Sequence, residues 1–577
     1  MRHLSSSADS KRPEGGRLPL RRYAPWLATL ALGLAVFLFW RLRYPFALVY
    51  QEQLQLFLFD GDYLTTRLAE PGGLARYVAE FLVQFYNSVT LGSIILAVLF
   101  MLVQRLTWQL IKPVADGWYA LSFVPAIMLW YAMGDENMLL TYTVALTMAL
   151  AAALAVRCLG RRALLVAAAV GIPILYWLIG PMVLLVAVCL SPAWVAAGAA
   201  VYAIALILGS AWIQPYPLLR LVLGVDYYRA PMTLPYVLMV IPAVTAVLCH
   251  GCRRLPLLRR PMAWGLAAGV ALLGLVGLDR GYDSKKYELI EYDYLVRLKD
   301  WQGIIAKAEA KTPDLPMSVS ATNLALAMTN QLGDRAFDFY QRGTEGLLPK
   351  FERNFATTQL TGEIYFHLGL VNTAQRLAFE AMESIPNYNK SGRVVKRLAE
   401  TNLINGEYAV ARKYLEMLEK TIFYRPWAER TLRLLGNEAA INAHPLYGAL
   451  RQFRLADDFL FSEDELDKIC GQLFLHNQKN QMAAQYLLMA PLLDIDIARF
   501  MSYAQYVQSQ INYNPRHCQE AIAFAFMQQR QQPPQGLVSQ FVLQQMNEFA
   551  RIYAANSSSP ELGRFRNTAW YYLTIGK

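Results

Sequence analysis

The chain has 577 residues, of which 55% are hydrophobic, and its formal net charge is +11. Such a composition is too apolar for an average soluble protein, and the length is sufficient for two or more domains. Residues 1–279 contain 21 Lys and Arg against 12 Asp and Glu, whereas residues 280–577 contain 33 against 31. The second half is therefore nearly neutral and has no basic stripe, which argues against nucleic acid as a partner.

The N-terminal half is a series of apolar runs separated by polar loops. The runs lie at 23–40, 87–104, 118–133, 138–156, 163–178, 180–190, 193–212, 233–250 and 262–278. Most of them approach the length that spans about 30 Å of hydrocarbon. The run 180–190 is short and begins with Gly180-Pro181, which is typical of a broken or re-entrant helix. We therefore expect a transmembrane domain of about eight or nine helices over residues 23–280.

The charges in the loops predict how this bundle is oriented. Residues 1–22 form a basic tail, and no small-residue cleavage site follows the first run, which indicates an uncleaved signal anchor. In alternate loops, fifteen Lys and Arg lie on the side of the N-terminus and six on the other side. The N-terminus is therefore expected in the cytoplasm. With nine spans the second half emerges outside, which for a bacterial inner membrane is the periplasm.

The C-terminal half alternates helical patterns with short turns and contains no convincing strand pattern. Within 281–450, one stretch has the spacing of a tetratricopeptide (TPR) helix pair, with small residues at the helix crossing and a closing proline. Its residues are Gly362, Tyr365, Ala374, Ala378, Ala381 and Pro386. We expect a TPR-like α-helical solenoid at 281–450, with a generic helical bundle as the alternative, and a further helical region at 451–577. The predicted fold class is all-α.

The long outer loop at 41–86 contains three carboxylates of interest. Glu52 lies in an apolar, Gln-rich stretch with no turn to explain it, and a carboxylate there is costly unless it faces a cavity or a partner. Asp60 and Asp62 flank Gly61, which is also ordinary turn chemistry. Glu52 therefore ranks first among the candidate catalytic residues, ahead of the two aspartates.

Two further polar groups occupy the next outer loops. Asp135 and Glu136 lie between two membrane helices, where they form either a polar hairpin loop or a pair of oxygen ligands suited to Mg²⁺ or Mn²⁺. The loop at 213–232 contains Arg220, Tyr228 and Arg229. Arginines at this surface can hold lipid phosphate oxygens, although interfacial Tyr and Arg also anchor helices. We take the first pair as a candidate metal site and the second group as a candidate site for a donor phosphate.

These features together resemble the GT-C type of glycosyltransferase, which uses polyprenyl-phosphate-linked sugars. That architecture has a cytoplasmic N-terminus, an essential carboxylate in a long first outer loop, a second acidic motif in the next outer loop and often a periplasmic C-terminal domain. The matching features occur in the same order here: Glu52 or Asp60 and Asp62, then Asp135 and Glu136, then the helical half. Pro71-Gly72-Gly73 resembles a proline-rich element of several such families. The resemblance covers roughly residues 20–280, and the first acidic motif departs from the family pattern because it is Gln-Glu-Gln.

The resemblance implies a mechanism. A lipid-linked sugar would enter from the bilayer, and Glu52 or Asp60 would deprotonate or orient the acceptor nucleophile. Asp135 and Glu136 would hold a divalent metal, Mg²⁺ or Mn²⁺, against the leaving phosphate, and the arginines of the loop at 213–232 would neutralise that phosphate. The acceptor would be a protein or a glycan, as in a protein O-oligosaccharyltransferase or a single-sugar transferase. The alternative, from another class, is a membrane-anchored TPR-like scaffold that recruits periplasmic partners without catalysis.

Overall fold

The computed structural model describes the backbone over most of the chain. The described residues are 20–112, 116–230, 235–252, 258–350, 352, 355–387, 389–455 and 465–576. Part of the basic segment used to predict the orientation, residues 1–19 together with Arg253 and Arg254, lies outside these ranges. Within them every regular element is a helix, and the β-type pairings are isolated bridges. The all-α prediction is confirmed.

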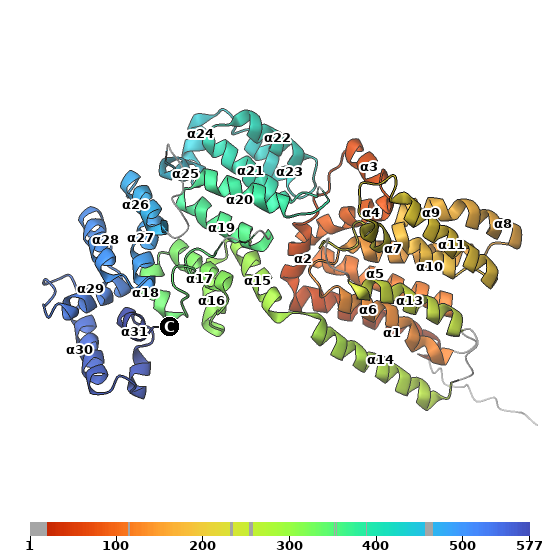
Figure 1. The fold of residues 1–577 in the computed structure, drawn as a ribbon, viewed down its shortest axis with the longest axis horizontal. Coiled ribbons are helices and arrows are strands. Elements are labelled where there is room, and N and C mark those ends of the chain that lie inside the picture. Colours follow the sequence, from red (N-terminus) through yellow and green to blue (C-terminus); the bar gives the residue numbers. More distant parts are fainter. Residues whose placement is uncertain are drawn as a thin grey trace, which may run out of the picture.

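The first half is a bundle of apolar helices with several short helices at one end (Figure 1). Its elements are α1 (Leu20–Leu38), η1 (Phe39–Arg43), α2 (Pro45–Glu52), α3 (Gly61–Leu68), α4 (Gly73–Val83), η2 (Gln84–Asn87), α5 (Val89–Ile111), η3 (Asp116–Phe123), α6 (Val124–Ala132), α7 (Leu140–Val156), α8 (Arg161–Val166), η4 (Ala167–Gly171), α9 (Ile172–Ile179), η5 (Gly180–Met182), α10 (Val183–Val188), α11 (Ala193–Ser210), α12 (Leu218–Leu223), α13 (Tyr236–Gly251) and α14 (Arg260–Gly281). The predicted outer loop at 41–86 therefore contains the short helices α2, α3 and α4.

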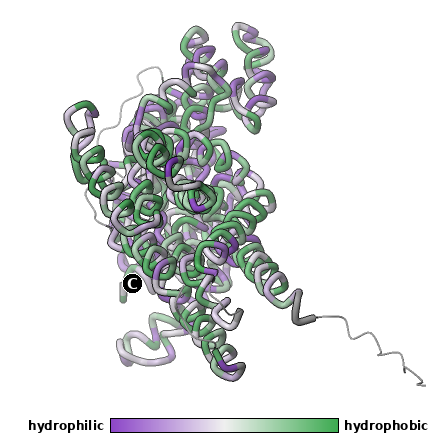
Figure 2. The backbone as a smooth tube through the Cα atoms, turned by 90° about the vertical axis from the view of Figure 1, so that its right-hand side faces the viewer, coloured by the Kyte–Doolittle hydropathy of each residue, from purple (hydrophilic) through white to green (hydrophobic). Residues whose placement is uncertain are grey.

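Several described helices could cross a membrane. Five are long and apolar enough: Tyr23–Arg43, Val89–Ile111, Arg162–Val188, Ala193–Ser210 and Pro261–Gly281. Three shorter apolar helices accompany them: Gly117–Ala132, Leu140–Val156 and Tyr236–Gly251. In α14 only 11% of the most apolar stretch is buried, so this helix exposes side chains such as Trp264 and Leu273 as a lipid-facing helix does. A view from the membrane-half end shows many hydrophobic turns among the helices (Figure 2).

Within the candidate span Arg162–Val188 the chain reverses at Gly180, and the short α10 follows. The φ of Gly180 is 65°, a left-handed conformation that favours glycine. Gly180 packs against Gly72 and Tyr227 at the end of the bundle that adjoins the second half. At the opposite end, a ring nitrogen of His250 lies 2.8 Å from the carbonyl oxygen of Val188. The start of α1 and the second half lie at opposite ends of the bundle (Figure 1).

The second half begins two residues after α14 ends, and it consists of consecutive helices. They are α15 (Ser284–Leu298), α16 (Trp301–Ala310), α17 (Pro316–Met328), α18 (Leu332–Arg335), η7 (Ala336–Asp338), α19 (Phe355–Leu368), α20 (Val371–Glu383), α21 (Gly392–Asn405), α22 (Tyr408–Glu419), α23 (Arg425–Leu432), α24 (Glu438–Ala443), α25 (Tyr447–Phe453), α26 (Leu466–His476), α27 (Gln481–Leu493), α28 (Ile497–Gln510), α29 (Arg516–Gln528), α30 (Gln540–Ala555), η9 (Pro560–Phe565) and α31 (Ala569–Ile575). The expected boundary at 450–451 falls inside α25.

Two helix hairpins occupy the positions of the TPR-like pattern. α19 and α20 are joined at Gly369, and α21 and α22 at Gly406, and both glycines have a positive φ at the end of the first helix. Small residues let the helices approach closely, since a Cβ atom added at Gly362 would lie 3.7 Å from Leu377, and Ala374 is buried. The assignment of these hairpins to the TPR class stays a prediction.

The short outer helices lie between the two halves. The backbone N–H of Leu56 donates to the carbonyl of Lys390, and that of Phe59 donates to the carbonyl of Lys420, both at 2.8 Å. Leu56 also packs in a small hydrophobic core with residues of α21 and α22. The segment after α2 therefore joins the membrane bundle to the helical half through both hydrogen bonds and apolar contacts.

Candidate functional site

Polar side chains from three outer loops and from α15 meet where the two halves join. We call this set the Asp135 cluster; it consists of Tyr50, Gln51, Asp135, Glu136, Asn137, Tyr228, Arg229 and Lys286. The loop between α6 and α7 forms its centre. Met138, near the end of that loop, pairs with Tyr228 in an isolated antiparallel bridge, which holds the loop between α11 and α13 alongside.

Asp135 is held by hydrogen bonds on both carboxylate oxygens. The hydroxyl of Tyr228 donates to its Oδ2 at 2.6 Å, and the backbone N–H of Asn137 donates to its Oδ1 at 2.9 Å. Arg229 lies beside this pair, because its Nε donates to Asn137 Oδ1 at 3.0 Å. Asp135 and Arg229 are half-buried. The cluster therefore places an oriented carboxylate near a guanidinium at the ends of apolar helices that adjoin the helical half.

Glu136 connects the centre of the cluster to the first outer loop and to α15. Gln51 Nε2 donates to its backbone carbonyl at 2.8 Å, and Lys286 Nζ lies 2.9 Å from its Oε1. The hydrogen bond to Glu136 raises the pKa of Lys286, and burial raises the pKa of Tyr50. The charges of the Asp135 and Glu136 carboxylates are thus balanced by those of Arg229 and Lys286. The Lys286 side chain is 53% exposed.

Glu52 follows Gln51 in the chain, but its carboxylate faces the helical half rather than the Asp135 cluster. Arg297 Nη2 lies 3.2 Å from its Oε2, and the Tyr424 hydroxyl donates to its Oε1 at 2.9 Å. Burial and the neighbouring Glu52 carboxylate raise the pKa of Tyr424, so its hydroxyl stays a donor. The cavity beside Glu52 has a volume of about 10 Å³, which is too small for a sugar. Glu52 ranked first because it is an acid in an apolar stretch without a turn. Its partners Arg297 and Tyr424, in the helical half, explain this position.

The two aspartates of the first loop have capping and surface positions. Asp60 is the N-cap of α3, where it accepts the backbone N–H of Asp62, and it forms an ion pair with Lys420. That hydrogen bond from Lys420 lowers the pKa of Asp60. Asp62 is exposed in the first turn of α3. No described contact joins either residue to the Asp135 cluster.

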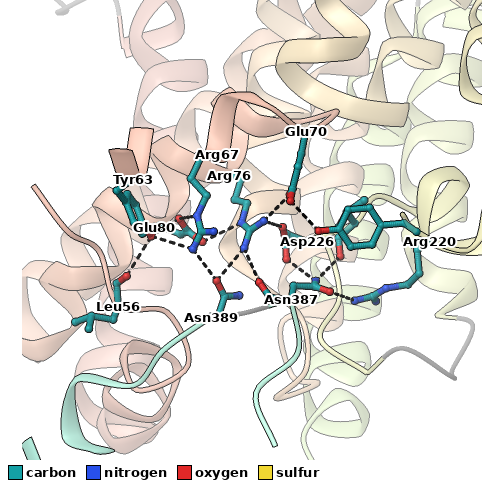
Figure 3. A network of polar contacts seen from close by, with 12 residues as sticks. Leu56, Tyr63, Arg67, Glu70, Arg76, Glu80, Arg220, Asp226, Asn387 and Asn389 are labelled. Carbon is teal, nitrogen blue, oxygen red and sulfur yellow. Dashed lines mark hydrogen bonds and ion pairs between the residues drawn. The ribbon is translucent and has the colours of Figure 1, made fainter. Parts of the chain in front are cut away.

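Arg220 belongs to a second buried group, which we call the Arg76 network (Figure 3). Its members are Arg67, Glu70, Arg76, Glu80, Arg220, Asp226, Asn387 and Asn389. Arg76 Nη1 lies 2.7 Å from both Glu70 Oε2 and Asp226 Oδ2, and its Nε lies 3.0 Å from Glu80 Oε1. Asn389 Oδ1, from the helical half, accepts hydrogen bonds from both Arg67 and Arg76.

The charges of the Arg76 network cancel, because three arginines face three carboxylates. A buried set of this kind gains little by taking up an additional anion, and it joins the two halves through Asn387 and Asn389. Arg220 is buried, and its Nη1 donates to the carbonyl of Tyr228 at 2.8 Å. It therefore holds the backbone of the third loop in place, whereas Arg229 and the Tyr228 side chain belong to the Asp135 cluster.

The described residues offer few side chains that could bind a metal ion at one place. Among the described residues, no group of three or more His, Cys, Asp and Glu side chains gathers in a metal-binding arrangement. Mg²⁺ is often held by one or two carboxylates together with substrate phosphates. Asp135 and Glu136 would supply the carboxylate ligands. Lys286 already lies against Glu136 as a cation. A divalent metal at Asp135 and Glu136 stays a prediction.

Sequence reasoning missed several members of both groups. Tyr50 and Gln51 adjoin Glu52, and Asn137 adjoins Glu136, so proximity in sequence was a usable signal for them. Lys286 had no such signal, since it lies in a Lys-Lys pair at the start of α15, 150 residues after its partner. Asn389 likewise lies in an ordinary turn between two helices.

The fold and the site together define an all-helical protein with candidate membrane-spanning helices and a large helical half that meets one end of the bundle. The chain belongs to DUF6057, a family of unknown function, whose model matches residues 21–576. Comparisons with curated proteins and with solved structures found no match.

Proposed function

We propose that this protein is a membrane glycosyltransferase. It transfers a sugar or an oligosaccharide from a polyprenyl-(pyro)phosphate donor to an acceptor on the periplasmic face of a bacterial inner membrane. One observation supports the proposal most: the Asp135 cluster gathers Asp135, Tyr228, Arg229 and Lys286 where apolar helices end beside the helical half. A phosphate on a lipid reaches such a position without leaving the bilayer surface.

The cluster supplies the groups that a glycosyl transfer needs. The acceptor hydroxyl attacks the anomeric carbon of the donor sugar, its proton passes to the Asp135 carboxylate, and the bond from the sugar to the lipid phosphate breaks. Arg229 and Lys286 face the departing phosphate and stabilise its negative charge. Tyr228 holds the carboxylate of Asp135 through its hydroxyl.

The same geometry argues for Asp135 rather than Glu52 as the general base. Glu52 is engaged by Arg297 and Tyr424 and has no adjoining space for a sugar. Asp135 is half-buried, and the two residues that follow it contact cations: Glu136 pairs with Lys286, whose side chain is 53% exposed, and Asn137 accepts from Arg229. The acceptor is a protein or a glycan, and a protein O-oligosaccharyltransferase is the specific form that we propose.

Asp135→Asn tests the proposal in a strain that lacks the wild-type gene. Periplasmic glycoproteins are detected by a glycan stain and their glycans compared by mass spectrometry. We expect glycosylation to fall by about 100-fold or more, the size of a lost general base. Asp62→Asn is the matched control, because Asp62 is an exposed acid of α3 without a described contact to the Asp135 cluster. Unchanged glycosylation by a folded Asp135→Asn variant would exclude this function.

A second candidate function is a membrane-anchored scaffold without catalysis. It is favoured by the position of the larger cavities: two of about 430 and 460 Å³ lie in the C-terminal helices, whereas those at the junction hold about 10 Å³ each. A scaffold of this kind would keep its full activity in cells when Asp135 is replaced by Asn. The same experiment therefore separates the two functions.

A further inference from the structure

A cavity of about 460 Å³ lies in the helical half, apart from the Asp135 cluster. It opens between the segment that follows α18 and the C-terminal helix α31. Both elements lie beyond α16 and α17 on the side remote from the membrane bundle (Figure 1). The volume falls in the range of about 300–1,000 Å³ that small-molecule sites occupy.

Aromatic rings form much of the wall of this cavity. They belong to Phe337, Phe339, Tyr340, Tyr571 and Tyr572. The rings of Phe337 and Tyr572 lie 5.0 Å apart and are buried, so they form a rigid floor. Tyr340 and Tyr571 are half-buried, which leaves part of each side chain open to a ligand. A wall of this kind suits a ligand with flat faces of C–H groups.

The rim of the cavity is polar but has no net charge of its own. Asp338, Arg566 and Asn567 are exposed there. The Asp338 carboxylate lies 3.3 Å from Arg335 and 3.9 Å from Arg516, and the side-chain amide of Asn567 donates to it at 3.5 Å. Arg335 and Arg516 also pair with Glu309 and Glu520, so the charges around the rim are compensated and do not favour a strongly charged ligand. The ligand that matches both wall and rim is uncharged, with apolar faces and hydroxyl groups around its edge.

We propose that this cavity binds a short neutral saccharide. Sugar rings stack their C–H faces on the tyrosine rings, and their hydroxyl groups pair with the Asp338, Arg566 and Asn567 side chains. A peptide segment is less suited, since the cavity has polar side chains at its rim rather than a free edge of backbone groups. The proposal does not depend on catalysis at the Asp135 cluster, because the two sites share no residue.

Saturation-transfer NMR on the full chain in lipid nanodiscs tests this site; nanodiscs avoid maltoside detergents, which would compete for it. The probes are the hexasaccharides of glucose, mannose and N-acetylglucosamine, together with an uncharged nonapeptide. We expect at least one hexasaccharide to bind, and Tyr571→Ala to weaken that binding by roughly tenfold. Arg566→Ala replaces an exposed side chain, so it tests the rim without threatening the fold. Tyr553→Ala is the control, since Tyr553 is a half-buried tyrosine on α30 outside the cavity.

Each outcome decides the proposal. Binding that both cavity variants weaken and the control retains supports it. Binding of the peptide alone, binding of no hexasaccharide, or equal binding by wild type and both cavity variants overturns it. Asp135→Asn should bind the saccharide as wild type does. A failure of glycosylation in that variant and a failure of saccharide binding in Tyr571→Ala are therefore separate results.

Discussion

Arg297 Nη2 lies 3.2 Å from Glu52 Oε2, and the two residues belong to different halves of the chain. Their side chains are 16% and 5% exposed, so the pair is largely shielded from water. The hydroxyl of Tyr424 links the pair, because it donates to Glu52 Oε1 at 2.9 Å and accepts a hydrogen bond from Arg297 Nη2 at 3.2 Å. Removing one member of a buried pair leaves the other charge without compensation. The relationship therefore assigns Glu52 to the junction between the halves.

Glu52→Gln should lower the stability of the chain by about 2–4 kcal/mol, because it leaves the Arg297 guanidinium buried beside a neutral amide. Denaturant unfolding of the protein in nanodiscs measures the loss. Arg297→Gln should cost a similar amount, and the double variant should cost less than the sum of the two. Glu416→Gln, at an exposed position of α22, is the control. A Glu52→Gln variant with wild-type stability and no glycosylation would instead make Glu52 catalytic.

Asn389→Ala should also loosen the junction. Asn389 Oδ1 accepts from Arg67 Nη2 at 3.0 Å and from Arg76 Nη2 at 2.9 Å, so its loss leaves two buried N–H groups of cations without this acceptor. A hydrogen bond to a charged group contributes about 1.5–3 kcal/mol, and we expect a total loss of about 2–4 kcal/mol. Limited proteolysis near Asn389 should become faster. Asn512→Ala, at an exposed position, should change neither readout, and equal behaviour of the two variants would contradict the role of Asn389.

Local sequence was sufficient to predict the class of fold. The apolar runs match the thickness of a bilayer, and Gly180-Pro181 marked the place where the chain reverses, because both residues act on their own backbone. Partners of charged residues could not be predicted in this way. Glu52 and Asp135 are both acids of outer loops, and only the tertiary fold separates them: Glu52 meets Arg297, 245 residues later, while Asp135 meets Tyr228.

The arginines illustrate the same limit. In the sequence, Arg67 and Arg76 were only two charges in the count that predicted the orientation, while Arg220 was a candidate for phosphate binding. In the structure all three are buried, Arg67 and Arg76 against carboxylates and Arg220 against the backbone carbonyl of Tyr228. Burial of a charge depends on which segments pack around it, and those segments are far apart in the chain. The local sequence therefore does not distinguish an arginine that binds phosphate from one that is buried at the junction between the two halves.

The stability of the helical half should fall in mild acid because of His367. Burial lowers the pKa of His367 from 6.5 to about 4. The unfolded chain then takes up a proton at this residue as the pH falls below about 6.5, while the folded chain stays neutral there until about pH 4. Proton uptake by the unfolded state favours unfolding, so up to about 3 kcal/mol of stability is lost across this window.

His367→Gln should flatten this part of the pH profile. Denaturation midpoints measured between pH 7.5 and pH 4.5 should fall less steeply in the variant than in the wild type. His476→Gln is the control, since His476 is exposed. Glu363 adds a loss at lower pH: despite burial, which raises its pKa, Arg397 and Arg393 hold the value near 2, so its contribution disappears between about pH 4.5 and 2. A variant with the same slope as wild type above pH 4.5 would contradict the role of His367.

Three apolar helical segments, α5, η3 with α6, and α7, separate Asp62 from Cys158, which predicts that these two residues lie on opposite faces of the membrane. Cys158 follows α7 at the end remote from the helical half and is exposed, whereas the other five cysteines are buried. With a cytoplasmic N-terminus, a membrane-impermeant maleimide should label Cys158 only in inverted vesicles. An Asp62→Cys variant that also has Cys158→Ser should react only in spheroplasts. The reverse pattern would invert the proposed orientation, and labelling of both positions from one side would contradict the three passes between them.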